Sequence, residues 1–483
     1  MRKILLTALL AAGGLTASAQ NLPNGDFQQW KTTCGKSDQT SLNNYYESAP
    51  FGLATRPGVE PQDWNGSNVN QTVFNQNAHS DALVTRQGNA ENFYVRLVCT
   101  KVGALGITAE APAFINFGTP WVYAVSNKSK CDGGVYGGMS FSYKPDAIKG
   151  RYKRTPAATK EKARIIAYLW SGTFKSSIPS GKSTRMQDDV DRAIMGRVSG
   201  VTGDGKLVAS CDYGFETTKN NDWEEIVVPI NYKLTDVVPT KMNVIISSDD
   251  YWNRGNMVEN SKLEVDDVQF VYYHALKNVT YNGKPIEVKE NESQFYIPIS
   301  PDETFDLNKL KYDKVGIGAT VEDPVYDAAK NTVTITVKGN DYDKNDKSVT
   351  TYVFTIVKEQ TNFTDGLSVK LEGSGTFPIS DATIQLVKEL DDSYSFQLKN
   401  FSLAQGQIPV GTIRIKNLTI DGNHITAKQT IKIENGDDAT VESWMGPDLQ
   451  DVPVELDATR NGDKLVANIS IEFYGMKIHV LFA

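Results

Sequence analysis

Two adjacent carboxylates interrupt an otherwise apolar stretch, SKLEVDDVQFVYY, at residues 261–273. The β-branched and aromatic residues around them predict a strand that is covered on both faces. Neighbouring side chains in a strand point to opposite faces, so we expect Asp266 to share a face with Phe270. Asp267 then shares the other face with Val265. At least one carboxylate must be buried, which requires a hydrogen-bond partner, an ion pair or a metal ion.

A second group of residues suited to ligand binding lies in the polar stretch SSDDYWNRGN, at residues 247–256. Aromatic rings suit sugars because they stack on the apolar face of a pyranose, while Asp, Asn and Arg side chains hydrogen-bond to hydroxyl groups. Tryptophans in apolar strand contexts, such as Trp170 and Trp223, are instead expected in the core. The predicted ligand-binding residues are Trp252, Tyr251, Arg254, Asp249 and Asp250, with Trp64 and Trp121 as weaker candidates.

Other chemistry finds less support in the sequence. The chain has four histidines and no G-x-S-x-G motif, which disfavours a serine hydrolase. The stretch beginning Asp341-x-Asp343-x-Asn345 resembles the start of a calcium-binding loop. It lacks the required glycine and the bidentate glutamate, so we interpret it as a solvated hairpin turn. A pair of carboxylates for glycoside hydrolysis remains an alternative, because the distance between them decides that chemistry.

The elements that must position these residues are strands. Helical periodicity is almost absent apart from residues 186–197, and short alternating runs recur between Gly, Asn and Asp turns. The fold class is therefore all-β. We predict a signal peptide at 1–19, a β-sandwich at 20–275, a small immunoglobulin-like sandwich at 276–358 and an antiparallel barrel at 359–483, which TNFTDG opens as a linker.

Export and composition limit the choice of partners. Residues 1–19 combine Arg2 and Lys3, an apolar run and an A-x-A cleavage site, and no later stretch predicts a transmembrane segment. The formal charge of -8, without a basic block, argues against nucleic acid as a partner. Export would permit disulfides, whose candidates are Cys34, Cys99, Cys131 and Cys211; buried thiols are the alternative.

Three resemblances refine the domains. F-S-Y-K-P at 141–145, W-E-E-I-V-V-P-I-N-Y at 223–232 and S-K-L-E-V-D-D-V at 261–268 resemble the putative carbohydrate-metabolism domain of exported gut Bacteroidetes proteins, which implies a jelly-roll fold and association with glycans. P-V-G at 409–411 and W-M-G-P at 444–447 resemble the calycin-like, lipocalin-related barrel. The middle region is similar only in general to bacterial immunoglobulin-like modules.

A further resemblance concerns a metal. N-G-D-F at 24–27 and the D-D-V at 266–268 resemble the paired strand ends of carbohydrate-binding modules, which hold a structural calcium. The resemblance implies that Asp26, Asp266 and Asp267 are candidate calcium ligands. Gln28 stands where such modules often carry an acidic ligand. The alternative is a carboxylate that accepts backbone N–H bonds at the edge of a strand.

The favoured hypothesis is an exported, non-catalytic glycan-binding or glycan-utilisation accessory protein of the periplasm or cell surface. One alternative is a glycoside hydrolase or lyase with unrecognised carboxylates. Another is a structural module that binds a protein partner in the cell envelope.

Overall fold

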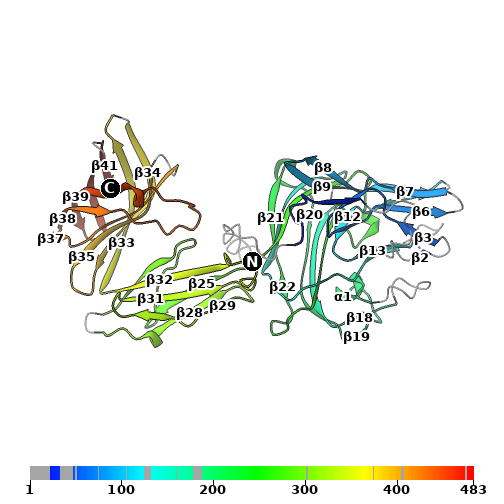
Figure 1. Cartoon of the computed structure of the whole chain (residues 1–483), viewed down its shortest axis with the longest axis horizontal. Helices are drawn as coiled ribbons and strands as arrows, with labels where there is room; N and C mark the ends of the chain where they lie inside the picture. Colours follow the sequence, from blue (N-terminus) through cyan, green and yellow to red (C-terminus); the bar gives the residue numbers. More distant parts are fainter. Residues whose placement is uncertain are drawn as a thin grey trace.

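The computed structural model describes residues 22–32, 47–48, 52–73, 76–104, 106–123, 132–158, 160–177, 188–300, 303–373, 375–403, 407–473 and 476–483. The described chain is almost entirely β-structure, as predicted. Figure 1 shows three blocks: the N-terminal sandwich at the right, the middle domain at lower centre and the C-terminal barrel at the left. None of the helices in these residues is long and apolar enough to cross a membrane.

Two antiparallel sheets form the N-terminal sandwich. The first, named here the β17 sheet, runs in the order β22 (Asn231–Tyr232), β20 (Lys206–Phe215), β17 (Ala163–Ser171), β23 (Lys241–Ser247), β12 (Phe114–Asn116) and β5 (Asn65–Gly66), and β15 (Met139–Ser140) also pairs with β23. The second, the β24 sheet, runs β21 (Glu224–Pro229), β16 (Ala147–Thr155), β24 (Lys262–Val271), β9 (Asn92–Val98) and β8 (Val84–Asn89). The main core lies between them.

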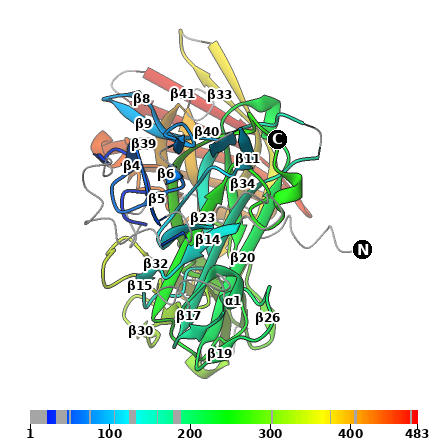
Figure 2. The same ribbon diagram turned by 90° about the vertical axis from the view of Figure 1, so that its right-hand side faces the viewer.

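The β17 sheet is covered on both faces, which explains the nearly continuous apolar sequence of β17. Ile165 and Leu169 face the main core, whereas Tyr168 and Trp170 face a second, smaller core on the outer side. This outer core also holds Val135 of β14 (Asp132–Tyr136), which pairs with β13 (Thr119–Tyr123), and Ile194 of α1 (Asp191–Ile194). Figure 2 shows α1 near the ends of β17 and β20. The helix is much shorter than the predicted 186–197.

A β-bulge in β24 corrects the predicted faces of the paired aspartates. The register against β16 shifts between Lys149 and Arg151, and Asp267 has a positive φ of 50°. The extra residue restores the alternation one position later, so Val265 and Val268 both face the main core. Asp266 is buried outside that core and Asp267 is exposed. A strict period of two gives the wrong partners for both carboxylates.

The turn at residues 24–27 meets this bulge, as the resemblance to carbohydrate-binding modules implies. The backbone N–H of Val268 donates to the carbonyl of Gly25 at 2.8 Å. A Cβ atom at Gly25 would lie 1.9 Å from the carbonyl oxygen of Val268, so only glycine permits the approach. Phe27, in the same turn, is fully buried in the main core.

The middle domain is a small sandwich around its own core. One sheet runs β26 (Lys284–Pro285), β25 (Ala275–Tyr281) and β28 (Leu310–Val315). The other runs β27 (Gln294–Pro298), β32 (Val349–Val357), β31 (Thr332–Lys338) and β29 (Thr320–Val321), with β30 (Val325–Asp327) also paired to β31. Strand β27 runs parallel to β32, and the other pairs are antiparallel.

The loop that begins at Asp341 is a hairpin turn between β31 and β32, as predicted, but it is only partly solvated. It packs against the N-terminal sandwich, where the Tyr143 hydroxyl donates to Asp343 Oδ2 at 2.9 Å and the Lys144 backbone N–H donates to Asn340 Oδ1 at 2.6 Å. Asp341 is fully buried and accepts a bond of 2.6 Å from the Ser348 hydroxyl. This loop therefore joins the first two domains.

The C-terminal domain is one nine-stranded sheet. Its order is β36 (Ile408–Ile415), β35 (Tyr394–Leu403), β34 (Gly375–Lys388), β33 (Glu359–Leu371), β41 (Met476–Phe482), β40 (Lys464–Phe473), β39 (Asp451–Asn461), β38 (His424–Lys432) and β37 (Thr419–Asp421). A bridge between Thr412 of β36 and Glu434, just after β38, links the two sides of the sheet, which curves into a barrel. The predicted linker 361–366 lies inside β33, and β39 was not predicted.

Candidate functional site

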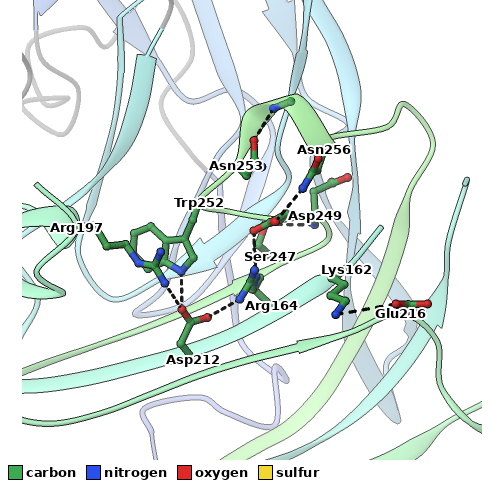
Figure 3. Close-up of polar contacts among 12 residues, drawn as sticks. Lys162, Arg164, Arg197, Asp212, Glu216, Ser247, Asp249, Trp252, Asn253 and Asn256 are labelled. Carbon is green, nitrogen blue, oxygen red and sulfur yellow. Dashed lines mark hydrogen bonds and ion pairs between the residues drawn. The ribbon is translucent and has the colours of Figure 1, made fainter. Parts of the chain in front are cut away.

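The predicted ligand-binding loop follows β23 and lies beside the ends of β17 and β20 (Figure 3). Arg164 of β17 occupies its centre and contacts two carboxylates. Its Nη1 lies 3.0 Å from Asp212 Oδ1, and its Nε donates to Asp250 Oδ1 at 3.0 Å. Alternation along β17 directs Arg164 to the same outer face as Tyr168, so the strand positions the cation and the loop supplies Asp250.

Trp252 is half-buried at the edge of this cluster. Its indole N–H donates to Asp212 Oδ2 at 2.9 Å, and the same oxygen lies 2.5 Å from Arg197 Nη2. The Arg197 guanidinium lies 4.2 Å from the centroid of the indole ring, and the Tyr251 ring meets it edge-on at 4.9 Å. These contacts fix the orientation of the ring.

Tyr251 serves as an anchor for the loop. Its hydroxyl donates to Asp191 Oδ2 at 2.5 Å, and the backbone N–H of Val135 donates to the same oxygen at 3.2 Å. Burial raises the pKa of Asp191 above its usual value. Burial and the neighbouring Asp191 carboxylate raise the pKa of Tyr251 well above the usual range. The Tyr251 hydroxyl is thus committed to the protein interior.

Asp249 is also directed inward. It is fully buried, where its Oδ2 accepts a bond of 2.6 Å from the Ser248 hydroxyl and its Oδ1 accepts one of 3.4 Å from the Val258 N–H. Burial raises the pKa of Asp249 to about 6. Of the two adjacent loop aspartates, therefore, only Asp250 belongs to the Arg164 cluster. Arg254 begins a short 3-10 turn, and its side chain lies outside the described residues.

The two weaker tryptophan candidates are core residues. Trp64 is 0% exposed, and its ring centroid lies 4.0 Å from that of Phe117. Its indole N–H donates to the carbonyl of Pro23 at 2.9 Å. Trp121 is 2% exposed, with the Arg192 guanidinium 5.3 Å from its ring centroid. Neither ring is accessible to a ligand in this structure.

Trp223, which its apolar context predicted to lie in the core, is at the surface. It precedes β21, is half-buried, and meets Tyr94 edge-on at 5.3 Å on the outer face of the β24 sheet. The Arg151 guanidinium lies 5.5 Å from its ring centroid. The alternation of WEEIVVP puts Trp223 on the same face as Glu225, and this signal could have identified its exposure.

The positions of Asp26, Asp266 and Asp267 do not bring three carboxylates together. Within the described chain, no group of three or more His, Cys, Asp or Glu residues is arranged to hold a metal ion. Asp266 Oδ1 accepts from the Asp267 backbone N–H at 3.0 Å, and Asp267 Oδ2 lies 3.7 Å from Arg151 Nη1. Burial and, secondarily, the Asp267 charge raise the pKa of Asp266 to about 6. The structure shows the backbone hydrogen bond that was the alternative.

Gln28 helps to explain why the three aspartates do not converge on a metal site. Its side-chain NH2 group donates to the Asp26 carbonyl at 2.6 Å, the Phe93 carbonyl at 3.1 Å and Asn92 Oδ1 at 3.3 Å. An uncharged donor therefore occupies the point on which these oxygens converge. A calcium ion shared by the three aspartates stays a prediction from the resemblance, and their geometry adds no support to it.

The cysteine prediction is corrected for two of its four residues. Cys99 and Cys211 are buried free thiols, and Cys34 and Cys131 lie outside the described residues. Burial, followed by the nearby Asp249, raises the pKa of Cys99, and burial raises the pKa of Cys211 to about 12. Both thiols are therefore poor nucleophiles in the folded protein.

Comparison with known proteins defines one domain. Residues 360–483 match the family model of the calycin-like β-barrel domain. No curated protein matches the chain.

Solved structures give weaker likenesses. A putative glycoside hydrolase from Bacteroides vulgatus is 15% identical, over 39% of this chain and 77% of that one, with a TM-score of 0.29. Another, from Bacteroides thetaiotaomicron, is 16% identical over 40% of this chain and 57% of that one, with a TM-score of 0.28. A carbohydrate-binding module that recognises mannan is 9% identical, over 43% of this chain and 88% of that one, with a TM-score of 0.17. These scores are too low to carry an argument about function.

Proposed function

We propose that this protein is an exported, non-catalytic glycan-binding accessory protein that holds a sugar against Trp252. The observation that carries the proposal is the partly exposed indole ring, held in one orientation by Asp212 and Arg197. A ring fixed before binding loses little conformational entropy when a sugar stacks on it. Asn253 and Asn256 lie exposed in the same loop and supply amide groups for sugar hydroxyls.

The carboxylates in this cluster favour binding over hydrolysis. Asp212 accepts from Arg164, Arg197 and Trp252, and Asp250 accepts from Arg164 and from Asn256 Nδ2 at 3.3 Å. A glycoside hydrolase needs one carboxyl group free to donate a proton and a second free to act as base or nucleophile. Here both groups are engaged in holding the loop. Export, to the periplasm or the cell surface, belongs to the proposal and rests on residues 1–19.

A glycan-array screen of the mature protein, followed by calorimetry on the glycans that bind, tests the proposal. Trp252→Ala should weaken binding about 5- to 150-fold, which corresponds to loss of a stacked contact of about 1–3 kcal/mol. Trp252→Phe should retain part of the affinity because a ring remains. Trp223→Ala is the matched control, since Trp223 is also half-buried near an arginine but lies on the other sheet.

Unchanged affinity in Trp252→Ala, with its melting temperature close to that of the wild type, would refute this site. Release of new reducing ends from a bound glycan by the wild-type protein would identify a hydrolase instead.

A further inference from the structure

The wall of the C-terminal barrel is split between two neighbouring strands. β34 and β35 pair only from Ile384 opposite Leu398 to Lys388 opposite Tyr394. Beyond Ile384, β34 pairs only with β33, and beyond Leu398, β35 pairs only with β36. In this part of the described chain, two strand edges therefore face a common opening instead of each other.

The middle domain lies against this opening and encloses a cavity of about 460 Å³. The Tyr296 hydroxyl, from β27, donates to Gln397 Oε1 of β35 at 2.5 Å. Asp437 of the barrel accepts from the Ser293 and Gln294 backbone N–H groups at 3.2 and 2.9 Å. These bonds fix the two walls of the cavity relative to each other. Its volume falls within the range of about 300–1,000 Å³ that is usual for small-ligand pockets.

The cavity combines amide groups with an apolar floor. Its lining includes Gln360, Asn362, Gln385, Ile379, Leu398 and Phe401. Asn362 Oδ1 accepts from Gln360 Nε2 at 2.8 Å and from Gln385 Nε2 at 3.4 Å. Gln385 Oε1 is inaccessible to solvent and has no hydrogen-bond partner in the structure. A buried acceptor without a partner costs free energy, so this part of the wall is not optimised for stability alone.

The cavity lining holds two lysines and two glutamates, Lys289, Lys399, Glu287 and Glu292, so its formal charges balance. Lys399 Nζ lies 2.7 Å from Glu292 Oε2 and 2.9 Å from Asp437 Oδ2. Lys399 is therefore already paired and is not free to bind a phosphate or a carboxylate. The interior of the barrel is filled by apolar side chains such as Phe363, Phe396 and Phe482, so a ligand would bind in the wall and not in the lumen.

We propose that this junction pocket is a second binding site, for a short neutral oligosaccharide, independent of Trp252. Side-chain amides supply the paired donors and acceptors that sugar hydroxyls require, and the apolar floor covers the C–H face of the ring. The choice of a sugar as ligand rests on the proposed function of the protein. The pocket itself does not depend on it.

A peptide strand fits the opening less well. Register shifts occur in β35 between Leu398 and Phe401 and again before Ser402, and Asn400 has a positive φ of 52°. These irregularities interrupt the even series of N–H and C=O groups that an added strand needs. The edges are therefore better suited to a compact ligand.

The test uses the full mature chain and a panel of neutral tri- and tetrasaccharides built from glucose, mannose or xylose. We expect calorimetry to reveal two classes of site for at least one sugar. The double substitution Asn362→Leu and Gln385→Met should weaken the junction site at least about 10-fold, because it removes the central amides while keeping similar volumes. Gln429→Met is the matched control, an amide on β38 that lies outside the pocket lining.

Substitution of Trp252 by alanine separates the two proposals. If it leaves one class of site intact and the double variant removes that class, the junction site is confirmed. If Trp252→Ala removes all sugar binding, or if the double variant binds as the wild type does, the inference is overturned while the proposed function stands. Absence of binding to the whole panel by the wild-type protein overturns it as well. The inference of a sugar site is also overturned if a peptide binds the wild-type protein but not the double variant. Melting curves of every variant confirm that it is folded.

Discussion

The Trp252 cluster and the junction pocket differ in how their polar side chains are paired. Around Trp252 the arginines and aspartates satisfy one another, and the cluster presents a fixed ring at its edge. At the junction pocket the lining residues Lys399 and Glu292 form an ion pair, and the Gln385 side chain in the lining holds a buried acceptor without a partner. The first site therefore depends on an internal ion network, and the second depends on two domains remaining in contact. This difference predicts different responses to substitution and to pH.

The largest effect is expected from Arg164→Met. Removal of the guanidinium leaves Asp212 and Asp250 without their shared cation, at side-chain exposures of only 17% and 12%. The free energy of unfolding should fall by about 3–4 kcal/mol, as for other ion pairs that lose one partner in a largely buried setting. Chemical denaturation measures this change. Sugar binding at the junction pocket should persist in the folded variant.

Lys162→Met is the control for that substitution. Lys162 and Glu216 form an exposed pair 4.0 Å apart on the same part of the sandwich (Figure 3). Its loss should change stability by less than about 1 kcal/mol. Equal losses in the two variants would contradict the idea that the Arg164 cluster holds the loop.

The second prediction concerns pH. Because burial raises the pKa of Asp249 to about 6, the folded protein binds this proton more tightly than the unfolded chain does. The resulting stability is fully present below about pH 4 and is lost as the pH rises through about 6. The difference from the usual value of 3.8 corresponds to about 2–3 kcal/mol. Asp249→Asn should flatten the unfolding profile between pH 4 and 6, measured by denaturation at each pH.

A substitution at the junction pocket serves as the control for this pH dependence. Gln385→Met removes no titrating group, so its pH profile should parallel that of the wild type. A wild-type profile that rises between pH 4 and 6 in step with Asp249→Asn would show that Asp249 does not titrate as the structure implies.

The smallest effect is expected at the junction, from Asp437→Asn. This change removes the charge that Lys399 contacts and weakens an acceptor used by Ser293 and Gln294. We expect a loss of about 1–2 kcal/mol and faster hydrogen exchange at those two backbone amides, with weaker sugar binding in the pocket alone. Asp438→Asn, which alters a local turn with Thr440, should leave exchange at those amides unchanged. Equal exchange in the two variants would contradict the role of Asp437 in joining the domains.

Much of the fold followed from alternation and turn residues. The β17 and β31 sequences, for example, show the covered and half-covered strand patterns that the structure contains. Alternation failed where the backbone departs from a regular strand. The bulge at Asp267 reversed the expected faces, and TNFTDG, despite its turn-forming residues, continues β33 because β34 pairs with it.

The candidate site shows the same limit at single residues. The sequence drew attention to SSDDYWNRGN because aromatic and polar residues share one loop, but it could not separate Asp249 from Asp250. Asp249 turns inward to Ser248, and Asp250 turns to Arg164, a residue far away in the sequence. Likewise, the sequence ranked Trp252 above Trp64 but kept both as candidates, and only the structure shows that Trp64 is buried and Trp252 half-exposed.

By itself, then, the sequence determined the all-β class, the strands and the residue types able to bind a sugar. These properties depend on local periodicity and side-chain chemistry, which are written along the chain. The tertiary structure alone decided which carboxylates meet Arg164, that Gln28 sits among the oxygens near Asp26, and that β34 and β35 separate beside the middle domain. Each of these depends on distances between segments far apart in the chain, and such distances are set only when the domains pack.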